Sequence, residues 1–370
     1  MAITEPLAEF GSNEEERLIR DSVHRMVQEN RKPVVLDGKI CAPGNHARAY
    51  LRALEALGLS ELIVSDKRVD IASIRRIAII SEEAGAGLYL APVAESLGLS
   101  LLQAAGLTER NDTQHSQGVT LTALGDPFAG TAILPVARSA EAGQLRVSGK
   151  LSRVPFAPLA AQFVALAANE AGVQLLRIPA DARGVSVAAE SMADGTQRGE
   201  IAFDNCLVSR DDQIASDRQA AQGAALLVDV MLLSTAAQLA GIAARAQQMA
   251  AEHLLTRHQF GRPLAAFQAL QHRAANDYVG VEVVRAFLYQ MCDYWDEEAT
   301  RRTLLHALMA KASQTAIDTA KSAIQCFGAM GFTSEHEIGW QLRAAVTLST
   351  RYGGLATHRR LFAEGNIAFW

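Results

Sequence analysis

Apolar residues recur with helical spacing near the start of the chain. In the stretch 14–30, Leu18, Val23 and Met26 fall on one side of a predicted helix, and the stretch 71–87 repeats this pattern. Short loops separate these pieces. Residues 1–117 are therefore predicted to form a helical domain.

Residues 118–216 show a different pattern. Short runs such as VTLTAL, QLRVSG and FVALAA are rich in β-branched residues and are separated by Gly, Asp and Asn turns. These runs predict a middle domain that is a compact antiparallel sheet or small barrel.

From residue 217 to residue 370 only helical patterning remains. The segments are about 30 residues long, which corresponds to about 45 Å each at ~1.5 Å per residue. Long helices joined by short turns predict an antiparallel four-helix bundle. The predicted fold class is α+β, mostly helical, with the β domain between two helical ones.

Composition narrows the classes of partner. The chain has 370 residues, a net charge of −5 and a sequence pI near 6.0, with no block of Lys and Arg, so a nucleic-acid partner is not expected. The most apolar stretch, 224–251, contains Asp229 and Arg245, which favours a buried helix over a membrane span.

Cysteine and histidine spacing argue against a metal site. Cys41, Cys206, Cys292 and Cys326 lie far apart without a CxxC pair, and the histidines form no tight ligand pattern. Separate cysteines are typical of a reducing compartment. Because the acidic N-terminus also lacks the pattern of a secretory signal, we expect the chain to remain in the cytoplasm.

Two glycine-containing turns in the C-terminal half carry candidate binding chemistry. The first reads RHQFGRP from Arg257, with Phe267-Gln268 after it, and a planar guanidinium is suited to fork onto a pyrophosphate. The second reads QCFGAMGF from Gln325, where glycines allow a ligand to approach the backbone closely.

Together these turns resemble motifs of the acyl-CoA dehydrogenase family: Arg-x-x-Phe-Gly then Phe-Gln, and Gln-x-x-Gly-Gly-x-Gly. The order of the three predicted domains is also similar to that family's. The resemblance implies FAD as cofactor and an acyl-CoA thioester as substrate, with these turns holding the ADP half of a flavin shared across a subunit interface. The residues implied in cofactor binding are Arg257, Gln259, Phe260, Gln268, Gln325, Gly328, Gly331 and Thr357.

The base that this resemblance would require is absent. The family commonly has a catalytic glutamate in Tyr-Glu-Gly-Thr, whereas this chain reads Tyr352-Gly353-Gly354, and glycine has no side chain to take a proton. Other members place the glutamate on the first bundle helix, at a position that is Met231 here. Asp229 precedes it by two residues, which turns it about 200° around a helix. It is the fallback candidate for a relocated base.

Residues that would face the flavin ring and thioester are also replaced. Gly125 stands where the family has threonine in a Thr-Glu-Pro-x-Ala-Gly-Ser loop, although Thr131 keeps a hydroxyl at the end of that loop. Arg153 and Pro155 stand where the family has the Trp and Thr of Asn-Gly-x-Lys-x-Trp-Ile-Thr. Proline can donate no hydrogen bond there.

Three hypotheses follow. The leading one is a non-catalytic subunit that dimerises with a glutamate-bearing homologue, completes that partner's FAD site and forms an α₂β₂ tetramer. The second is a homo-oligomeric dehydrogenase that uses a relocated base such as Asp229. The third is a flavin-free scaffold or acyl-CoA-binding protein. His358, beside Arg359 and Arg360, is interpreted as part of a solvated basic face, and the acyl group is left open.

Overall fold

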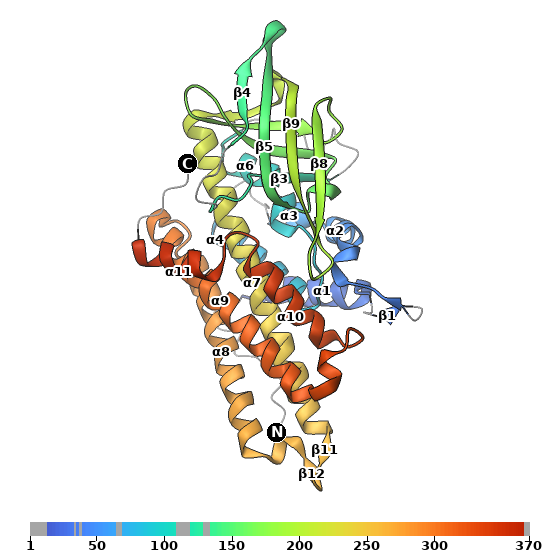
Figure 1. The fold of residues 1–370 in the computed structure, drawn as a ribbon. Coiled ribbons are helices and arrows are strands. Elements are labelled where there is room, and N and C mark those ends of the chain that lie inside the picture. Colours follow the sequence, from blue (N-terminus) through green and yellow to red (C-terminus); the bar gives the residue numbers. More distant parts are fainter. Residues whose placement is uncertain are drawn as a thin grey trace.

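The computed structural model describes residues 13–32, 35–36, 39–63, 69–108, 119–128 and 134–365. Figure 1 shows an elongated molecule with the sheet at one end and long helices reaching to the other. Helices come first, strands follow, and helices end the chain. The predicted α+β, mostly helical fold class is confirmed.

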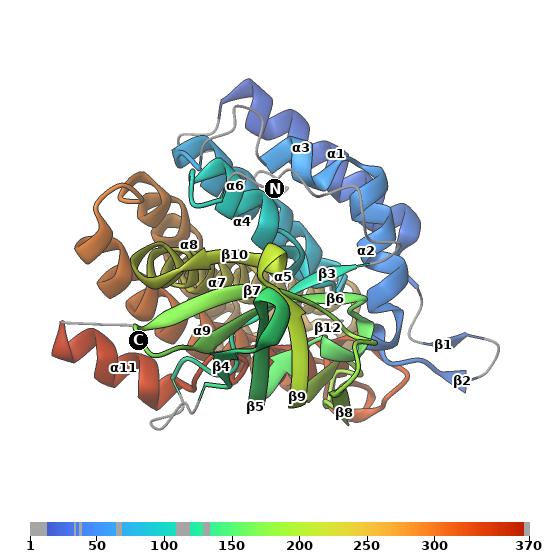
Figure 2. The same ribbon diagram turned by 90° about the horizontal axis from the view of Figure 1, so that it is seen from above.

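The N-terminal part is a group of helices that lies along one side of the sheet (Figure 2). Its two longest helices start at side-chain caps: Asn13 accepts a hydrogen bond from the Glu16 amide, and Asp70 accepts one from the Ser73 amide, both at 2.8 Å. The helices are α1 (Glu14–Asn30), α2 (Ala47–Ala56), α3 (Leu59–Ile63), α4 (Ile71–Ala86), α5 (Val93–Ser96) and α6 (Gly98–Ala104), with a small β1–β2 ladder (Val35–Leu36, Lys39–Ile40) between α1 and α2.

The middle part is an eight-stranded sheet with the order β10-β7-β6-β4-β5-β9-β8, in which β3 also pairs with β6. Most pairs are antiparallel, as the strand pattern predicts, but β3 and β4 run parallel to β6. Alternation along a single strand does not reveal the direction of its neighbour, so the mixed character was not predictable. The strands are β3 (Thr120–Ala123), β4 (Val136–Ser139), β5 (Gln144–Pro155), β6 (Gln162–Ala168), β7 (Val173–Pro179), β8 (Val185–Ser191), β9 (Gln197–Ser209) and β10 (Gln213–Ser216).

The C-terminal part is a bundle of four helices with a fifth, short helix packed on it. Helix α7 is the central helix, because it packs against α4, α8, α9 and α10. The helices are α7 (Asp217–Thr256), α8 (Gln268–Asp293), α9 (Glu298–Phe327), α10 (Glu337–Ser349) and α11 (Leu355–Glu364). A hairpin of β11 (His258–Gln259) and β12 (Arg262–Pro263) joins α7 to α8.

Helix α7 crosses α4 at a contact that only glycine permits. A Cβ atom placed on Gly241 would lie 1.9 Å from the Glu82 carbonyl oxygen, and one placed on Gly85 would lie 2.1 Å from the Gln238 carbonyl oxygen. Within the described residues α7 is the one helix apolar and long enough to span a bilayer, and 94% of its most apolar stretch is buried in the protein.

Charged residues pin the N-terminal helices to the bundle. Glu82 on α4 is buried and binds Arg20 of α1 at 2.9 Å and Arg285 of α8 at 2.6 Å. Burial alone would raise the pKa of Glu82, but the two guanidinium groups hold it at about 2. Removal of either arginine would therefore leave part of a buried negative charge without compensation.

Candidate functional site

The two glycine-containing turns lie at the same end of the bundle. The ring of His253, near the end of α7, stacks on Phe327 at the end of α9 with centroids 4.3 Å apart, and Phe327 packs against His336 at 4.4 Å. A small buried cluster joins the same helix ends: Ala246, Met249, Ala250, Ala320, Ala323, Ile324 and Ile338. The structure thus brings together segments that hold Arg257 and Gln325, which are far apart in the sequence.

The first turn is a tight hairpin that presents an aromatic ring to solvent. Arg257 ends α7, and the β11–β12 ladder is closed by Phe260 and Gly261, whose φ angles are 54° and 76°. A two-residue hairpin loop requires positive φ, which glycine adopts freely and phenylalanine rarely. Phe260 nevertheless holds this conformation with 87% of its surface exposed. An exposed ring on a strained backbone is a feature of binding sites.

Polar side chains beside this turn are available to a ligand. Arg257, Gln259 and Gln268 are exposed, and within the described parts of the chain their side chains make no hydrogen bond or ion pair. By contrast, Arg262 in the same hairpin stacks its guanidinium over the Phe267 ring at 4.0 Å. The hairpin therefore offers one free guanidinium and two free amide groups.

The second turn follows α9 directly. Gly328 caps the helix with a φ of 64°, and a short 3₁₀ turn, η7, continues from Gly328 to Phe332. A Cβ atom on Gly331 would lie 2.8 Å from the Ile324 carbonyl oxygen, so this position also requires glycine. Gln325 is exposed on the last turn of α9, and Phe332 is 78% exposed. The second turn therefore adds a polar and an aromatic side chain to the same end.

Gly353 and Thr357 lie in a different part of the bundle. Gly353 precedes α11 and Thr357 lies in the first turn of that helix, which packs on α9 near His306. Along α9, His306 is separated from Gln325 by about 28 Å at ~1.5 Å per residue. Thr357 therefore lies with Gly353, and the structure does not bring it near Arg257 within one chain.

An aromatic group fills the space beside Gly353. A Cβ atom on Gly353 would lie 3.4 Å from Cβ and Cδ2 of Phe128 and 3.4 Å from Cγ2 of Thr357. The Phe128 ring in turn meets His306 and His358 edge-on, at centroid distances of 5.2 and 5.6 Å. The position that carries a glutamate in related proteins is thus walled by side chains.

His358 is not part of a solvated basic face, as its charged neighbours in the sequence had indicated. It is fully buried, and its Nδ1 lies 2.8 Å from Nδ1 of His306, which is also fully buried. Burial lowers the pKa of His306 to about 3 and that of His358 to about 4. Both imidazoles are therefore neutral near pH 7.

Arg153, one of the residues that replace the family's ring-facing side chains, is bound to Asp126. Asp126, almost fully buried, accepts hydrogen bonds from the Phe128 amide at 3.0 Å and from Arg153 at 3.0 Å. Beyond them a cavity of about 20 Å³ is lined by Arg153, Pro155, Phe156, Met192, Thr196, Gln197, Arg198, Thr347, Thr350 and Arg351. This volume suits about one water molecule. Thr131 lies outside the described residues.

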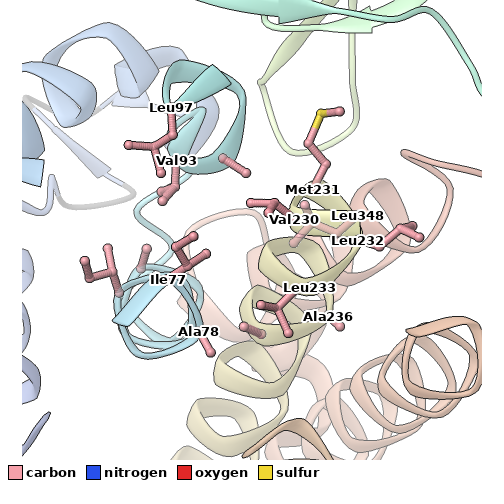
Figure 3. Close-up of a cluster of buried hydrophobic side chains, with 14 of the residues drawn as sticks. Ile77, Ala78, Val93, Leu97, Val230, Met231, Leu232, Leu233, Ala236 and Leu348 are labelled. Atoms are coloured by element: carbon pink, nitrogen blue, oxygen red, sulfur yellow. The ribbon is translucent and has the colours of Figure 1, made fainter. Parts of the chain in front are cut away.

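The second position for a family glutamate is part of the core. Figure 3 shows Met231 extending from α7 in the same apolar cluster as Leu97 and Leu348, and it is 4% exposed. A methionine there packs and takes no proton. The alternative glutamate position is therefore a core position in this chain.

Asp229 is held in an ion pair. Its carboxylate is fully buried and lies 2.9 Å from Arg301 Nε and 3.9 Å from Arg302 Nε, both at the start of α9. Burial raises the pKa of Asp229 to about 6, against the opposite effect of the two guanidinium groups. A fully buried, doubly paired carboxylate is poorly placed to meet a substrate.

The fit of these residues to FAD differs between its two halves. At the end that holds Arg257 and Gln325, exposed donors and a glycine-shaped backbone fit a diphosphate and an adenine. At the other end, a Cβ atom on Gly353 would already contact Phe128, and the cavity lined by Arg153 and Thr350 has room for about one water molecule, so the described residues there do not fit an isoalloxazine ring. A larger cavity, about 490 Å³, lies between α1, α4, α7 and α8 and contains none of the predicted site residues.

Comparison with known proteins agrees with the fold. A family model described as "Acyl-CoA dehydrogenase, C-terminal domain" matches residues 228–366. A benzylmalonyl-CoA dehydrogenase from Aromatoleum aromaticum is 25% identical over 363 residues, which covers 90% of this chain and 93% of that protein. A mitochondrial isovaleryl-CoA dehydrogenase from Oryza sativa is 28% identical over 151 residues, 41% of this chain and only 37% of that protein's length.

Solved structures show the same arrangement along almost the whole chain. A crystal structure of the ChsE4-ChsE5 complex from Mycobacterium tuberculosis superposes with a TM-score of 0.79 at 20% identity, covering 96% of this chain and 98% of that one. Butyryl-CoA dehydrogenase from Megasphaera elsdenii gives a TM-score of 0.78 at 16% identity, covering 96% and 99%.

Proposed function

Because this chain belongs to the acyl-CoA dehydrogenase family, we propose that it is a non-catalytic subunit of a flavin-dependent enzyme that introduces a double bond between the α and β carbons of an acyl-CoA thioester. A catalytic homologue supplies the carboxylate base and the site for the flavin ring. This chain supplies the groups that hold the ADP half of the same flavin.

One observation carries this proposal: within a single chain, one half of the expected site exposes polar groups, and the other half is packed with side chains. Arg257, Gln259 and Gln325 are exposed and lie together at one end of the bundle. Gly353 is walled by Phe128 at the other end. A division of labour between two subunits accounts for this asymmetry, whereas a general loss of function would not be expected to spare one half of the site.

The chemistry assigned to this chain is binding and orientation. The guanidinium of Arg257 would hold the diphosphate through paired hydrogen bonds, and the amides of Gln259, Gln268 and Gln325 would donate to and accept from the nucleotide. The bound flavin would supply the hydride acceptor. The α-proton would go to the partner's carboxylate, because neither Gly353 nor Met231 has a group that titrates.

The proposal extends to assembly and compartment. The ChsE4-ChsE5 complex is an assembly of two differently named chains, and a likeness to it fits an α₂β₂ tetramer in which each unlike pair shares one flavin. The four cysteines are free, as in proteins of a reducing compartment, so we place the tetramer in the cytoplasm.

The first experiment measures the ratio of FAD to polypeptide. After saturation with FAD and gel filtration, this chain alone is expected to retain almost none, because contacts to the ADP half alone give weak, reversible binding. A one-to-one mixture with a catalytic homologue is expected to retain about one FAD per two chains. About one FAD per chain without a partner would contradict the proposal and direct attention to Asp229 in a homo-oligomeric enzyme. No FAD in the mixture would favour a flavin-free scaffold.

The second experiment tests the nucleotide-binding end directly, by titration of ADP into the full chain. Arg257→Ala removes the free guanidinium and is expected to weaken ADP binding at least tenfold, which corresponds to about 1.4 kcal/mol. The matched control is Arg359→Ala, which removes an exposed arginine from α11, far from both turns. Equal ADP affinity in both variants would rule out Arg257 as a diphosphate ligand.

A further inference from the structure

Phe128 lies beside Gly353, the glycine that stands where the family resemblance would place a base. Gly353 has a φ of 87°, which other residues adopt only under strain, and a Cβ atom added there would lie in van der Waals contact with Phe128 and Thr357, 3.4 Å from each. Any side-chain atom beyond Cβ at this position would start from a point already in contact with Phe128 and Thr357. Phe128 therefore restricts the space available to a side chain at position 353.

Bonds within and beside the 126–128 segment hold the Phe128 ring in its position next to Gly353. Asp126 accepts a hydrogen bond from the Phe128 amide at 3.0 Å, and Arg153 binds the other carboxylate oxygen of Asp126 at 3.0 Å. Arg153 itself has a φ of 59°, so this strand end is shaped to reach Asp126. The residue that replaces the family's ring-stacking tryptophan thus helps to fix the phenylalanine.

The far side of the Phe128 ring is closed by the histidine pair. His306 from α9 and His358 from α11 share a hydrogen bond of 2.8 Å, and each meets the ring edge-on. Both are fully buried and uncharged near pH 7, since burial lowers the pKa of each. The ring and the pair therefore pack together as a group of uncharged side chains.

We propose that Phe128, His306 and His358 form a plug that closes this chain's own flavin-ring pocket, and that Phe128 is its removable part. The plug excludes an isoalloxazine ring and prevents a carboxylate at position 353 from taking a working conformation. This inference goes beyond the shared-site proposal, because it holds whether or not the chain contributes to a partner's flavin.

Lumiflavin, which carries the isoalloxazine ring without the ADP half, is the probe for the plug. We expect no quenching of lumiflavin fluorescence by the wild-type full chain and saturable quenching by Phe128→Ala. If the wild type shows any binding, its affinity for lumiflavin is expected to be at least tenfold weaker than that of Phe128→Ala. Phe362→Ala is the matched control, since it removes a half-exposed phenylalanine from α11 outside the plug. Equal binding by wild type and Phe128→Ala, or binding by neither, would overturn the proposal.

A melting experiment provides an independent readout. Gly353→Glu is expected to lower the melting temperature of the wild-type chain by more than it lowers that of the Phe128→Ala chain. The reason is that Phe128→Ala removes the ring that would obstruct the glutamate side chain. Equal decreases in both backgrounds would show that the two positions are not coupled. If Phe128→Ala does not fold, Phe128→Val replaces it in both experiments, since it shortens the side chain and keeps an apolar group.

ADP binding separates this inference from the proposed function. Phe128→Ala is expected to leave the ADP affinity unchanged, because the plug and the nucleotide-binding end lie about 28 Å apart along α9. Lumiflavin binding by Phe128→Ala in a chain that does not bind ADP would support the plug and contradict the shared site. The reverse result would support the shared site and contradict the plug.

Discussion

At Phe260 the backbone adopts a conformation that few residues accept. A phenylalanine with a φ of 54° that buries almost none of its ring gains little from packing to offset the strain. Stability alone would favour Asn or Gly at this position of a two-residue hairpin. The aromatic ring is thus best explained by a contact with something outside the chain.

Phe260→Asn tests this explanation. Asparagine tolerates positive φ, so the free energy of unfolding, measured by urea titration, is expected to stay constant or rise by up to about 1 kcal/mol. ADP or FAD binding by the chain with its partner is expected to weaken. A variant that loses stability and keeps its nucleotide affinity would show that Phe260 serves the fold.

The histidine pair predicts a loss of stability in acid. The pKa values of His306 and His358 in the folded chain, about 3 and about 4, lie below the ordinary value of 6.5. A group whose pKa is depressed by folding contributes stability above its ordinary pKa and loses it as the pH falls. The expected loss is on the order of 2 kcal/mol per histidine between about pH 7 and pH 5, reduced by coupling between the two.

His358→Asn isolates this contribution, because asparagine keeps a polar side chain and does not titrate in this range. Urea unfolding at about pH 7 and pH 5 should show a smaller acid-induced decrease in the variant than in the wild type. Asp229 changes stability in the opposite direction, since its pKa is raised, but it is present in both proteins and cancels. An identical decrease would exclude the pair as its source.

Single residues differ in how far the sequence reveals them. The turn at Arg257 was predictable because Phe, Gly and a following Phe-Gln stand at fixed short spacing, and local spacing survives folding. The bond between His306 and His358 joins positions 52 residues apart, and the charged neighbours of His358 indicated solvent. Phe128 was equally hidden, because nothing in its own segment shows that it faces Gly353.

At the scale of elements, the crossing of α4 over α7 is controlled by Gly241. Gly241→Ala would place a methyl group 1.9 Å from the Glu82 carbonyl oxygen, and backbone yields to such a clash only when the helices separate. We expect a loss of about 3 kcal/mol or more in the free energy of unfolding. Chemical denaturation measures this loss directly.

Gly280→Ala is the control for the crossing. Gly280 also lies within a helix, but its nearest neighbour is a Thr315 methyl group at 3.5 Å, an ordinary contact. Alanine there should stabilise α8 by up to about 1 kcal/mol. Similar losses at both positions would mean that helix packing, rather than the α4–α7 crossing, determines the effect.

Helices and strands were predictable where their periodicity is local. The spacing of Leu18, Val23 and Met26 predicts an amphipathic helix, but of the three only Val23 and Met26 are buried, whereas Leu18 is 62% exposed. The buried apolar residues of α1 are Ile19, Val23, Met26 and Val27, so the prediction was right for Val23 and Met26 and wrong for Leu18. The direction of β3 relative to β6 depends on the whole sheet, so no single run of residues encodes it.

At the scale of the whole molecule, the proposed sharing of FAD would make flavin retention depend on assembly. When the ADP half and the ring half are held by different chains, separation of the chains removes half of the binding groups. Dilution of the mixed tetramer is therefore expected to release FAD, seen as a rise in flavin fluorescence, at the concentration where the chains separate by size-exclusion chromatography. Release at a constant fraction across dilutions would indicate a self-contained site.

Helix α9 carries Gln325 at one end and His306 near the other, with no side chain common to both neighbourhoods. Substitutions at sites this far apart with no shared partner usually have additive effects on the free energy of unfolding. A chain with both Gln325→Ala and Phe128→Ala should therefore show the sum of the two single changes in that free energy. The length of α9 therefore allows substitutions at one end without a necessary effect on ligand binding at the other.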